Sequence, residues 1–195
     1  MSHHIYHTRG IILASNAVGE SNRFYKIFTE ELGLIGGSAQ SVREGKSKLR
    51  YTLQDYSIVN VDLVRGKEVW RIVSAGAHRS LDTIKSDPTR LKLFASYCAL
   101  LSRLLQGEGR DQELFDDIIS VIDFLEKETI PKELTLSFES LSTFRVLAHL
   151  GYVDPEGYRD FFIRDVYAVG ILKDFEKIRS KVLHKISEAL SASHL

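Results

Sequence analysis

Hydrophobic and polar residues alternate through much of the first 80 positions, which is typical of strands with one buried face. The alternation is clearest late in this region, where Val59, Val61 and Leu63 fall on one side. Apolar stretches of this kind, separated by turn residues, predict strands at 5–13, 23–29, 34–42, 53–64 and 69–73. Five short strands within about 75 residues predict a small β-barrel.

Glycines and turn residues punctuate these strands. Gly10 is expected to bend or bulge the first strand, and the pair Gly36–Gly37 is expected to let the third bend sharply. Residues 30–33 predict a turn, and residues 65–67 predict a tight hairpin connection.

The hydrophobic period changes after Asp87 and Pro88, which are suited to the N-cap and first position of a helix. The following apolar residues are spaced by three and four, as on one helix face: Leu91, Phe94, Cys98, Leu101 and Leu105. Further helices are predicted at about 115–125, 132–150 and 171–190, with Gly151 as the residue that ends the third. The predicted class is β plus α, with a barrel domain at 1–80 and a helical domain at 81–195.

The charges divide at the same place. The 26 basic and 26 acidic residues cancel, but residues 1–79 carry 11 basic against 7 acidic side chains, a net charge of +4. The remainder carries 15 against 19, a net charge of −4. The neutral average therefore hides a basic strand-rich half, which favours an anionic partner for that half.

Other gross features narrow the function. A single cysteine, Cys98, excludes an internal disulfide framework and a zinc site built on paired cysteines. The N-terminus lacks the charged and apolar run of an export signal, and no apolar run has membrane-spanning length, so we expect the cytoplasm and no membrane partner. Phosphate-cradle, dinucleotide and nucleophile-elbow motifs are absent, so we expect no enzyme activity and no cofactor.

The segment 43–50 is the clearest candidate for binding chemistry. It contains four cations of the kind that contact nucleic-acid phosphates: Arg43, Lys46, Lys48 and Arg50. An ordinary solvated loop would have the same composition. Arg65 and Lys67, at the predicted hairpin, would extend this basic surface if the barrel folds them nearby.

Tyr51 and Tyr56 flank the basic segment, and aromatic rings stack on bases regardless of sequence. We therefore predict that both tyrosines stack on a bound strand, although a small barrel also needs bulky core residues.

Several segments together resemble the RecO family of bacterial recombination mediators. They are TRGIIL at 8–13, GESNR at 19–23, FTEELGL at 28–34, GKSKLR at 45–50 and VDLVRG at 61–66. In the second half, FRVLAHLGY at 144–152 is similar to the family's helix that ends in Leu-Gly-Tyr.

The resemblance implies an OB-fold barrel followed by a helical domain, in a DNA repair protein of the bacterial nucleoid. Such proteins bind single- and double-stranded DNA, anneal complementary strands, and with RecR help to load RecA onto strands coated by single-strand-binding protein (SSB). If the family's binding residues are transferred to this chain, the basic segment is expected to contact phosphates. Arg23 and Arg65 also occupy positions that match the family, where an arginine either binds DNA or stabilises the fold. Many family members hold zinc with four cysteines, but residues 152–170 contain none, so we expect no zinc.

The resemblance also implies that the helical domain receives the acidic C-terminal tail of SSB. Four cations are candidates to hold such a tail beside an apolar groove: Arg103, Arg110, Lys132 and Arg145. Two alternatives stay open, an RNA-binding OB-fold protein and an adaptor that acts through its helical half. A competition between DNA and RNA would test the first, and binding of an acidic peptide would test the second.

Overall fold

The structure, a computed structural model, describes residues 4–162 and 167–192. The chain forms two compact units. The first, called the barrel unit, contains residues 1–81 and 101–112. The second, called the helical unit, contains residues 82–100 and 113–195.

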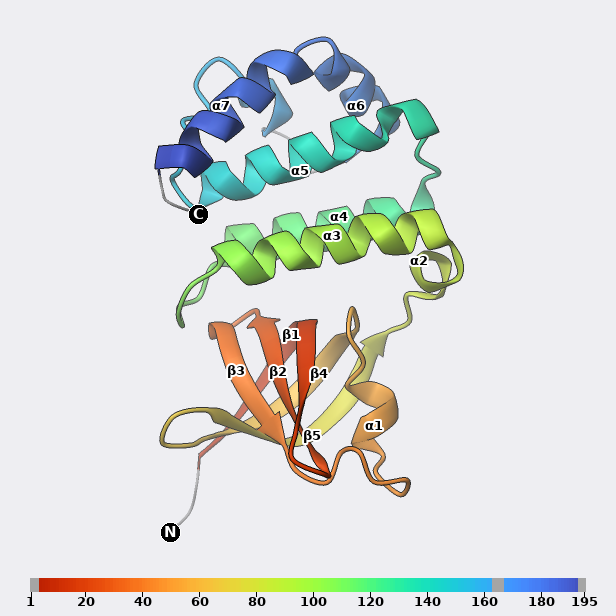
Figure 1. The fold of residues 1–195 in the computed structure, drawn as a ribbon, viewed down its shortest axis with the longest axis vertical. Helices are drawn as coiled ribbons and strands as arrows, with labels where there is room; N and C mark the ends of the chain where they lie inside the picture. The colour runs from red at the N-terminus through yellow and green to blue at the C-terminus, as the bar shows by residue number, and fades with distance from the viewer. Residues whose placement is uncertain (1–3, 163–166, 193–195) are drawn as a thin grey trace. The chain divides into compact units, whose positions relative to one another are not determined.

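Five strands close into the barrel of the first unit (Figure 1). The strands are β1 (Ile5–Val18), β2 (Asn22–Thr29), β3 (Gly33–Ala39), β4 (Ile58–Arg65) and β5 (Trp70–Arg79). Their order is β1-β2-β3-β5-β4, and every pair is antiparallel except β3 with β5. That parallel seam consists of Gly37 opposite Trp70 and Ser38 opposite Arg71. The barrel of OB type is confirmed.

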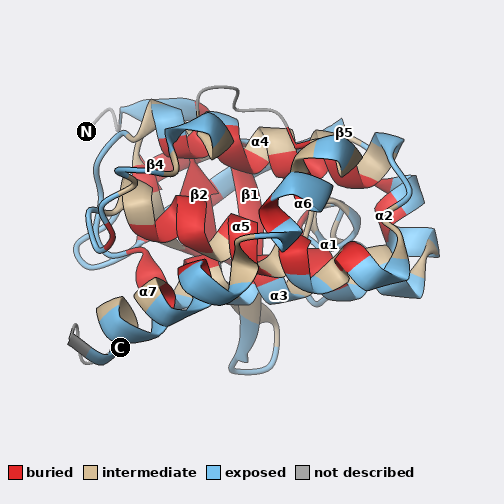
Figure 2. Cartoon of the chain, turned by 90° about the horizontal axis from the view of Figure 1, so that it is seen from above, coloured by how far each residue is buried: buried red, intermediate tan, exposed pale blue. Residues whose placement is uncertain are grey.

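The alternating positions fill the barrel interior, as the pattern predicted. The buried core contains Ile12, Tyr25, Ile27, Ile35, Ala39, Val42, Leu53, Val59, Val61, Leu63, Trp70 and Ile72. Figure 2 shows buried positions on β1 and β2 and on the inward sides of the helices. Period-two alternation therefore identified the strands because each strand has one buried face.

Gly10 in β1 and Gly36 in β3 lie at closely packed positions in regular register. The irregularity in β1 lies between Ile12 and Ala14, while Gly10 pairs regularly with β2 and β4. A Cβ at Gly10 would lie 2.7 Å from Ile27, so close packing explains this glycine. The pair in β3 also keeps regular register, and a Cβ at Gly36 would lie 2.5 Å from the Phe24 ring. Gly10 and Gly36 therefore make space for neighbouring side chains.

The segment between β3 and β4 differs from the prediction. A single helical turn, α1 (Leu49–Thr52), follows the basic turns, and β4 begins only at Ile58. The predicted strand start at 53 is wrong because Leu53 reaches the core from a loop, and Tyr56 has a φ of 63°. Such a positive φ is incompatible with a strand.

The second half is helical, as predicted. The helices are α2 (Asp82–Ser86), α3 (Pro88–Leu104), α4 (Gln112–Lys127), α5 (Thr135–His149), α6 (Val169–Glu176) and α7 (Arg179–Ala192), with 3-10 turns η1 (Lys132–Leu134) and η2 (Arg159–Phe161). Asp87 caps α3, since its carboxylate accepts bonds from the N–H groups of Thr89 (2.8 Å) and Arg90 (3.3 Å). Gly151, with a φ of 76°, ends the third predicted helix.

The fourth helix was predicted as one continuous helix, and this is wrong. The segment forms two helices, α6 and α7, separated by a break at residues 177–178. Phe175 and Val182, on either side of the break, are both fully buried. Their spacing keeps a helical period across the break, and for this reason the pattern did not reveal it. No described helix is long and apolar enough to cross a membrane.

Residues 101–112 belong with the barrel through specific contacts. The N–H of Gly109 donates to the carbonyl of Leu32 (3.0 Å), and Lys26 donates to the carbonyl of Ser102 (3.1 Å). A Cβ at Gly33, whose φ is 68°, would lie 2.2 Å from the Gly109 carbonyl oxygen. The barrel unit is thus assembled from two separate stretches of the sequence.

Candidate nucleic-acid interface

The predicted basic segment forms an ordered rim at one end of the barrel. We call residues 40–57, which join β3 to β4 and include α1, the rim loop (Figure 1). Buried Val42 and Leu53 anchor its two ends in the barrel core. The N–H of Tyr56 then donates to the carbonyl of Ile12 (2.9 Å), which fixes the return to β4. Anchored ends leave the polar middle of the loop exposed to solvent.

Contacts with the β1–β2 turn hold the start of the rim loop. The backbone N–H of Arg43 donates to Ser21 (2.9 Å), and its guanidinium donates to the carbonyl of Gly19 (2.9 Å). Ser41, with a φ of 52°, donates its N–H to Asn22 Oδ1 (2.9 Å). Arg43 is therefore positioned by the backbone of a neighbouring turn and not by an opposite charge.

Three arginines line one pocket beneath the rim loop. The pocket has a volume of about 400 Å³ and is mainly polar; its polar lining consists of Arg23, Tyr25, Arg43, Arg50, Gln54 and Asp55. Arg23, on β2, donates to Ser15 Oγ (2.9 Å), which directs it from the barrel wall. The structure thus brings together three of the predicted site residues that lie up to 27 positions apart in the sequence.

Two polar atoms in this pocket are buried without a hydrogen-bond partner among the described residues. They are the hydroxyl of Tyr25, whose side chain is fully buried, and Oδ1 of Asp55. Burial is the main cause that raises the pKa of Tyr25, and the Asp55 carboxylate also raises it, whereas the charge of the nearby Arg23 guanidinium and a side-chain contact with it lower the pKa. The phenol is therefore a protonated donor at neutral pH. Nothing in the sequence pattern assigned a binding role to Tyr25 or Asp55.

The remaining rim residues differ in how available they are. Lys46 and Lys48 are exposed, and Tyr51, on α1, is 72% exposed. Tyr56 is half-buried at the strained return of the loop, which leaves it less ring surface to offer a base. Of the two predicted stacking residues, Tyr51 has the more accessible ring.

The hairpin between β4 and β5 lies apart from the rim loop, since the hairpin and α1 are on different sides of the barrel (Figure 1). A DNA contact of Arg65 and Lys67 stays a prediction separate from the rim loop. Arg65 also forms an ion pair with Glu108 and lies 4.7 Å from the centre of the Trp70 ring. Burial raises the pKa of Glu108, but hydrogen bonds from Arg65 and from Trp70 (3.0 Å) outweigh burial and hold the pKa below its usual value. A neighbouring carboxylate thus offsets the Arg65 charge.

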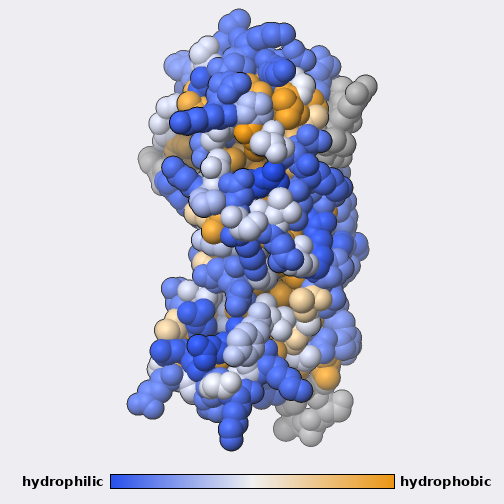
Figure 3. All heavy atoms as spheres, turned by 90° about the vertical axis from the view of Figure 1, so that its right-hand side faces the viewer, coloured by the Kyte–Doolittle hydropathy of each residue, from blue (hydrophilic) through white to orange (hydrophobic). Residues whose placement is uncertain are grey.

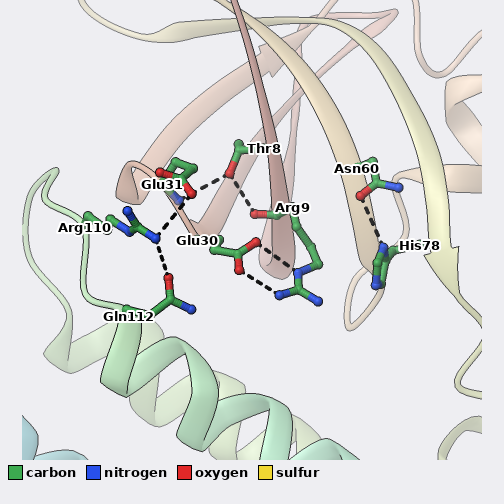
Figure 4. A network of polar contacts seen from close by, with 8 residues as sticks. All are labelled: Thr8, Arg9, Glu30, Glu31, Asn60, His78, Arg110 and Gln112. Carbon is green, nitrogen blue, oxygen red and sulfur yellow. Dashed lines mark hydrogen bonds and ion pairs between the residues drawn. The ribbon is translucent and has the colours of Figure 1, made fainter.

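Another face of the barrel unit carries paired charges. Figure 4 shows Arg9 in a two-point contact with Glu30, at 2.8 and 3.1 Å. Arg110, a predicted peptide-binding residue, lies 3.6 Å from Glu31 and donates to Gln112 (2.9 Å). Mixed and mutually satisfied charges of this kind suit an anionic backbone less well than the rim loop does.

The other predicted peptide-binding cations lie in different units and differ in exposure. Arg103 is exposed near the end of α3 in the barrel unit. Lys132 is exposed in the helical unit. Arg145 is only 1% exposed and pairs with Asp117 at 3.1 Å, so the expectation of an exposed Arg145 is wrong. It sits on α5, where the pattern of apolar neighbours gave no sign of its buried partner on α4.

Lys132 borders a groove in the helical unit with a volume of about 700 Å³. Leu93, Ile130 and Leu136 give the groove apolar surface, and Leu136 is 56% exposed. Lys92 and Lys132 add cations and Asp87 and Glu139 add carboxylates. Arg90 donates to the carbonyls of Leu125 (2.7 Å) and Glu126 (3.2 Å). Figure 3 shows apolar atoms among hydrophilic ones on the helical part of the face in view.

No group of three His, Cys, Asp or Glu side chains in residues 4–162 and 167–192 lies close enough to hold a metal ion.

The fold and the rim loop together define an OB-fold protein with a cationic rim. Sequence comparison makes the assignment specific: residues 1–83 match the family "Recombination protein O N terminal". The chain is 32% identical over 137 residues to the DNA repair protein RecO of Dehalococcoides mccartyi, covering 70% of this chain and 54% of the relative. It is 28% identical over 149 residues to that of Clostridium novyi (76% and 57%) and 30% identical over 123 residues to that of Rubrobacter xylanophilus (63% and 49%). The chain belongs to the RecO family, and it spans about half the length of these relatives.

Proposed function

We propose that this chain acts in DNA repair and recombination by binding DNA at the rim loop, without bond-making chemistry. The observation that carries the proposal is the set of exposed cations around one end of an OB-fold barrel, in a chain related to DNA repair proteins. Exposed lysines and arginines bind phosphates and release condensed counterions. Contacts of this kind would hold single and double strands alike and reduce the repulsion between two strands as they anneal.

The finer role follows from the family. We propose that the chain anneals complementary strands and, together with RecR, assists loading of RecA on SSB-coated DNA at the bacterial nucleoid. An annealing assay on SSB-coated complementary strands, with and without RecR, tests this role. Acceleration of annealing that increases with RecR supports it, and no acceleration over SSB-coated strands alone contradicts it.

Charge reversal of the rim loop tests the DNA interface directly. With about four phosphate contacts, the logarithm of the affinity for single strands should fall with the logarithm of salt concentration with a slope near −3. The triple variant Lys46→Glu, Lys48→Glu and Arg50→Glu should weaken binding to all sequences alike and flatten this slope, as measured by fluorescence anisotropy.

The matched control makes the same change in net charge elsewhere, by Lys127→Glu, Lys173→Glu and Lys181→Glu on exposed helical positions. Equal losses in the two triple variants would mean that only total charge matters. Unchanged affinity and slope in the rim variant would reject the rim loop as the interface.

The RNA-binding alternative shares the same cations, because phosphate contacts do not distinguish the two sugars. Competition between a DNA and an RNA strand of one sequence separates the two functions. We expect DNA to compete at least as well as RNA, and a clear preference for RNA would replace the proposed function.

A second function is favoured by the groove beside Lys132. Apolar surface flanked by Lys92 and Lys132 suits a short peptide with apolar and acidic residues, and we propose that the SSB tail binds there. Titration of a labelled tail peptide onto the whole chain should saturate. Lys132→Glu should weaken binding, while Lys127→Glu, outside the groove, should not; absence of saturable binding would reject the groove.

A further inference from the structure

The pocket beneath the rim loop is more elaborate than phosphate binding requires. Its volume of about 400 Å³ falls within the roughly 300–1,000 Å³ of small-ligand pockets, whereas backbone phosphates are bound on open surfaces. Its walls combine hydrogen-bond donors and acceptors around one partly open cavity. A surface that bound only the phosphate backbone would not need the Asp55 carboxylate in the pocket.

Two buried polar groups indicate that the pocket is built for a ligand. A buried hydroxyl or carboxylate oxygen without a partner costs free energy, which a ligand group would recover. The hydroxyl of Tyr25 and Oδ1 of Asp55 are both in this condition among the described residues, and both residues line the pocket. Arg50 is exposed and also lines the pocket, so its guanidinium can reach a ligand there.

The hydrogen-bonding capacities define the ligand. The guanidinium groups of Arg23, Arg43 and Arg50 only donate, whereas an ionised Asp55 only accepts. Inorganic phosphate offers acceptors alone and would be repelled by Asp55. A matching ligand must have acceptors on one edge and donors on another.

Among the four DNA bases, guanine has this arrangement. Its O6 and N7 atoms are adjacent acceptors that arginine contacts well. Its N1–H and 2-amino groups are adjacent donors, a pair that one carboxylate accepts in two-point fashion. Thymine has a single N–H between two carbonyls, and the amino groups of adenine and cytosine adjoin a ring acceptor.

We propose that the pocket binds one unpaired guanine of a single strand held by the rim loop, with N1–H and the 2-amino group on Asp55. The arginines contact O6, N7 or the adjoining phosphate, and the hydroxyl of Tyr25 gains a partner. This rests on the proposed function of the rim loop, since the strand must already be bound there.

The first experiment uses the whole chain and twelve-nucleotide strands by fluorescence anisotropy. One strand is all thymine, and the others carry a single central guanine, adenine, cytosine or hypoxanthine. We expect the guanine strand to bind roughly tenfold more tightly than the all-thymine strand. Adenine and cytosine should give little gain, and hypoxanthine, which lacks the 2-amino group, should lose most of the guanine gain.

Variants then assign the preference to the pocket. Asp55→Asn should abolish the preference for guanine while leaving binding of the all-thymine strand in place. Glu44→Gln, which removes one negative charge from an exposed position of the same loop, is the matched control and should keep the preference.

Tyr25→Phe separates ligand binding from folding. Removal of a buried hydroxyl without a partner should leave the urea midpoint unchanged or higher, while the preference for guanine falls several-fold. A lower midpoint with an unchanged preference would mean that the hydroxyl serves only the fold, and would overturn the proposed contact.

The outcomes distinguish this inference from the proposed function. Tight binding with equal affinity for all five strands overturns the guanine pocket and leaves the rim loop as a DNA interface. A guanine preference that survives Asp55→Asn also overturns it. Absence of binding to any strand rejects both.

Discussion

Each unit of the chain brings arginine, tyrosine and carboxylate side chains together, and the two groups differ in whether their buried polar atoms have hydrogen-bond partners. In the helical unit, Arg145 donates from Nη1 to Asp117 (3.1 Å), and from Nε (2.9 Å) and Nη2 (2.5 Å) to the carbonyl of Phe161. Its guanidinium lies 4.3 Å from the ring centre of Tyr167. In the barrel unit, the Tyr25 hydroxyl and Oδ1 of Asp55 are buried without a hydrogen-bond partner among the described residues.

The tyrosines complete the contrast. Tyr97 and Tyr167 both direct their hydroxyls to Asp117 at 3.4 Å. Burial is the main cause that raises their pKa values, and the Asp117 carboxylate raises them further, so both phenols stay protonated donors. A buried polar network in which every group has a hydrogen-bond partner stabilises the fold. A network that contains groups without a partner can instead bind a ligand that supplies the missing hydrogen bonds.

The largest expected effect comes from breaking the satisfied network. Asp117→Ala leaves the Arg145 charge buried without a carboxylate and should lower the free energy of unfolding by about 3–5 kcal/mol, measured by urea denaturation. Lys127→Ala removes an exposed pair with Asp123 and should cost less than about 0.5 kcal/mol. A loss below about 1 kcal/mol for Asp117→Ala would place this network among weak surface pairs.

Next in size is the exposed ring of the rim loop. Tyr51→Ala should weaken binding of single strands by about 1–3 kcal/mol, because a base loses its stacking partner. Tyr51→Phe keeps the ring and should bind as the parent does. Duplex DNA, whose bases are already stacked, should respond less, and equal losses for duplex and single strand would argue against stacking.

A smaller effect distinguishes the rim loop from the hairpin. Lys46→Ala with Lys48→Ala should reduce the magnitude of the single-strand salt slope by about 1.4, at roughly 0.7 for each lost phosphate contact. Arg65→Ala with Lys67→Ala should change it less, because Glu108 already offsets the Arg65 charge. Salt titrations of both double variants test this order, and the reverse order would move the interface to the hairpin.

The smallest effect concerns pH. Hydrogen bonds from Arg9 are the main cause that lowers the pKa of Glu30 below its ordinary value of 4.5. The stabilisation from this group is therefore present above pH 4.5 and is lost as the pH falls through the lowered pKa. Glu30→Gln should remove that part of the acid-induced loss, up to about 1 kcal/mol in denaturant titrations between pH 6 and pH 3. A pH profile identical to the parent would contradict the assignment.

Local chemistry explains what the sequence predicted well. The alternation of Val59, Val61 and Leu63, the cap at Asp87 and the positive φ of Gly151 each depend on neighbours a few positions away. The exposed cations of the rim loop were also recognisable, since four cations in eight residues rarely lie in a core.

Contacts between distant positions account for what was missed. The glycine at position 10 makes space for the Ile27 side chain, and the burial of Arg145 depends on its ion pair with Asp117. Neither contact can be read from the local sequence pattern. Tyr25 and Asp55 meet only because β2 and the rim loop converge at one end of the barrel. Periodicity reports which side of an element is buried and not which distant side chains it will face.

The insertion of residues 101–112 into the barrel unit has a consequence for exchanging parts between relatives. A chimera joined at a single point near residue 85 would set one barrel against the Glu108 and Gly109 of another protein. Gly33 would then depend on a foreign backbone for its closest contact, and Arg65 on a foreign carboxylate. Helices and barrel are therefore best exchanged with three junctions, near residues 81, 100 and 112, so that the barrel keeps its own second stretch.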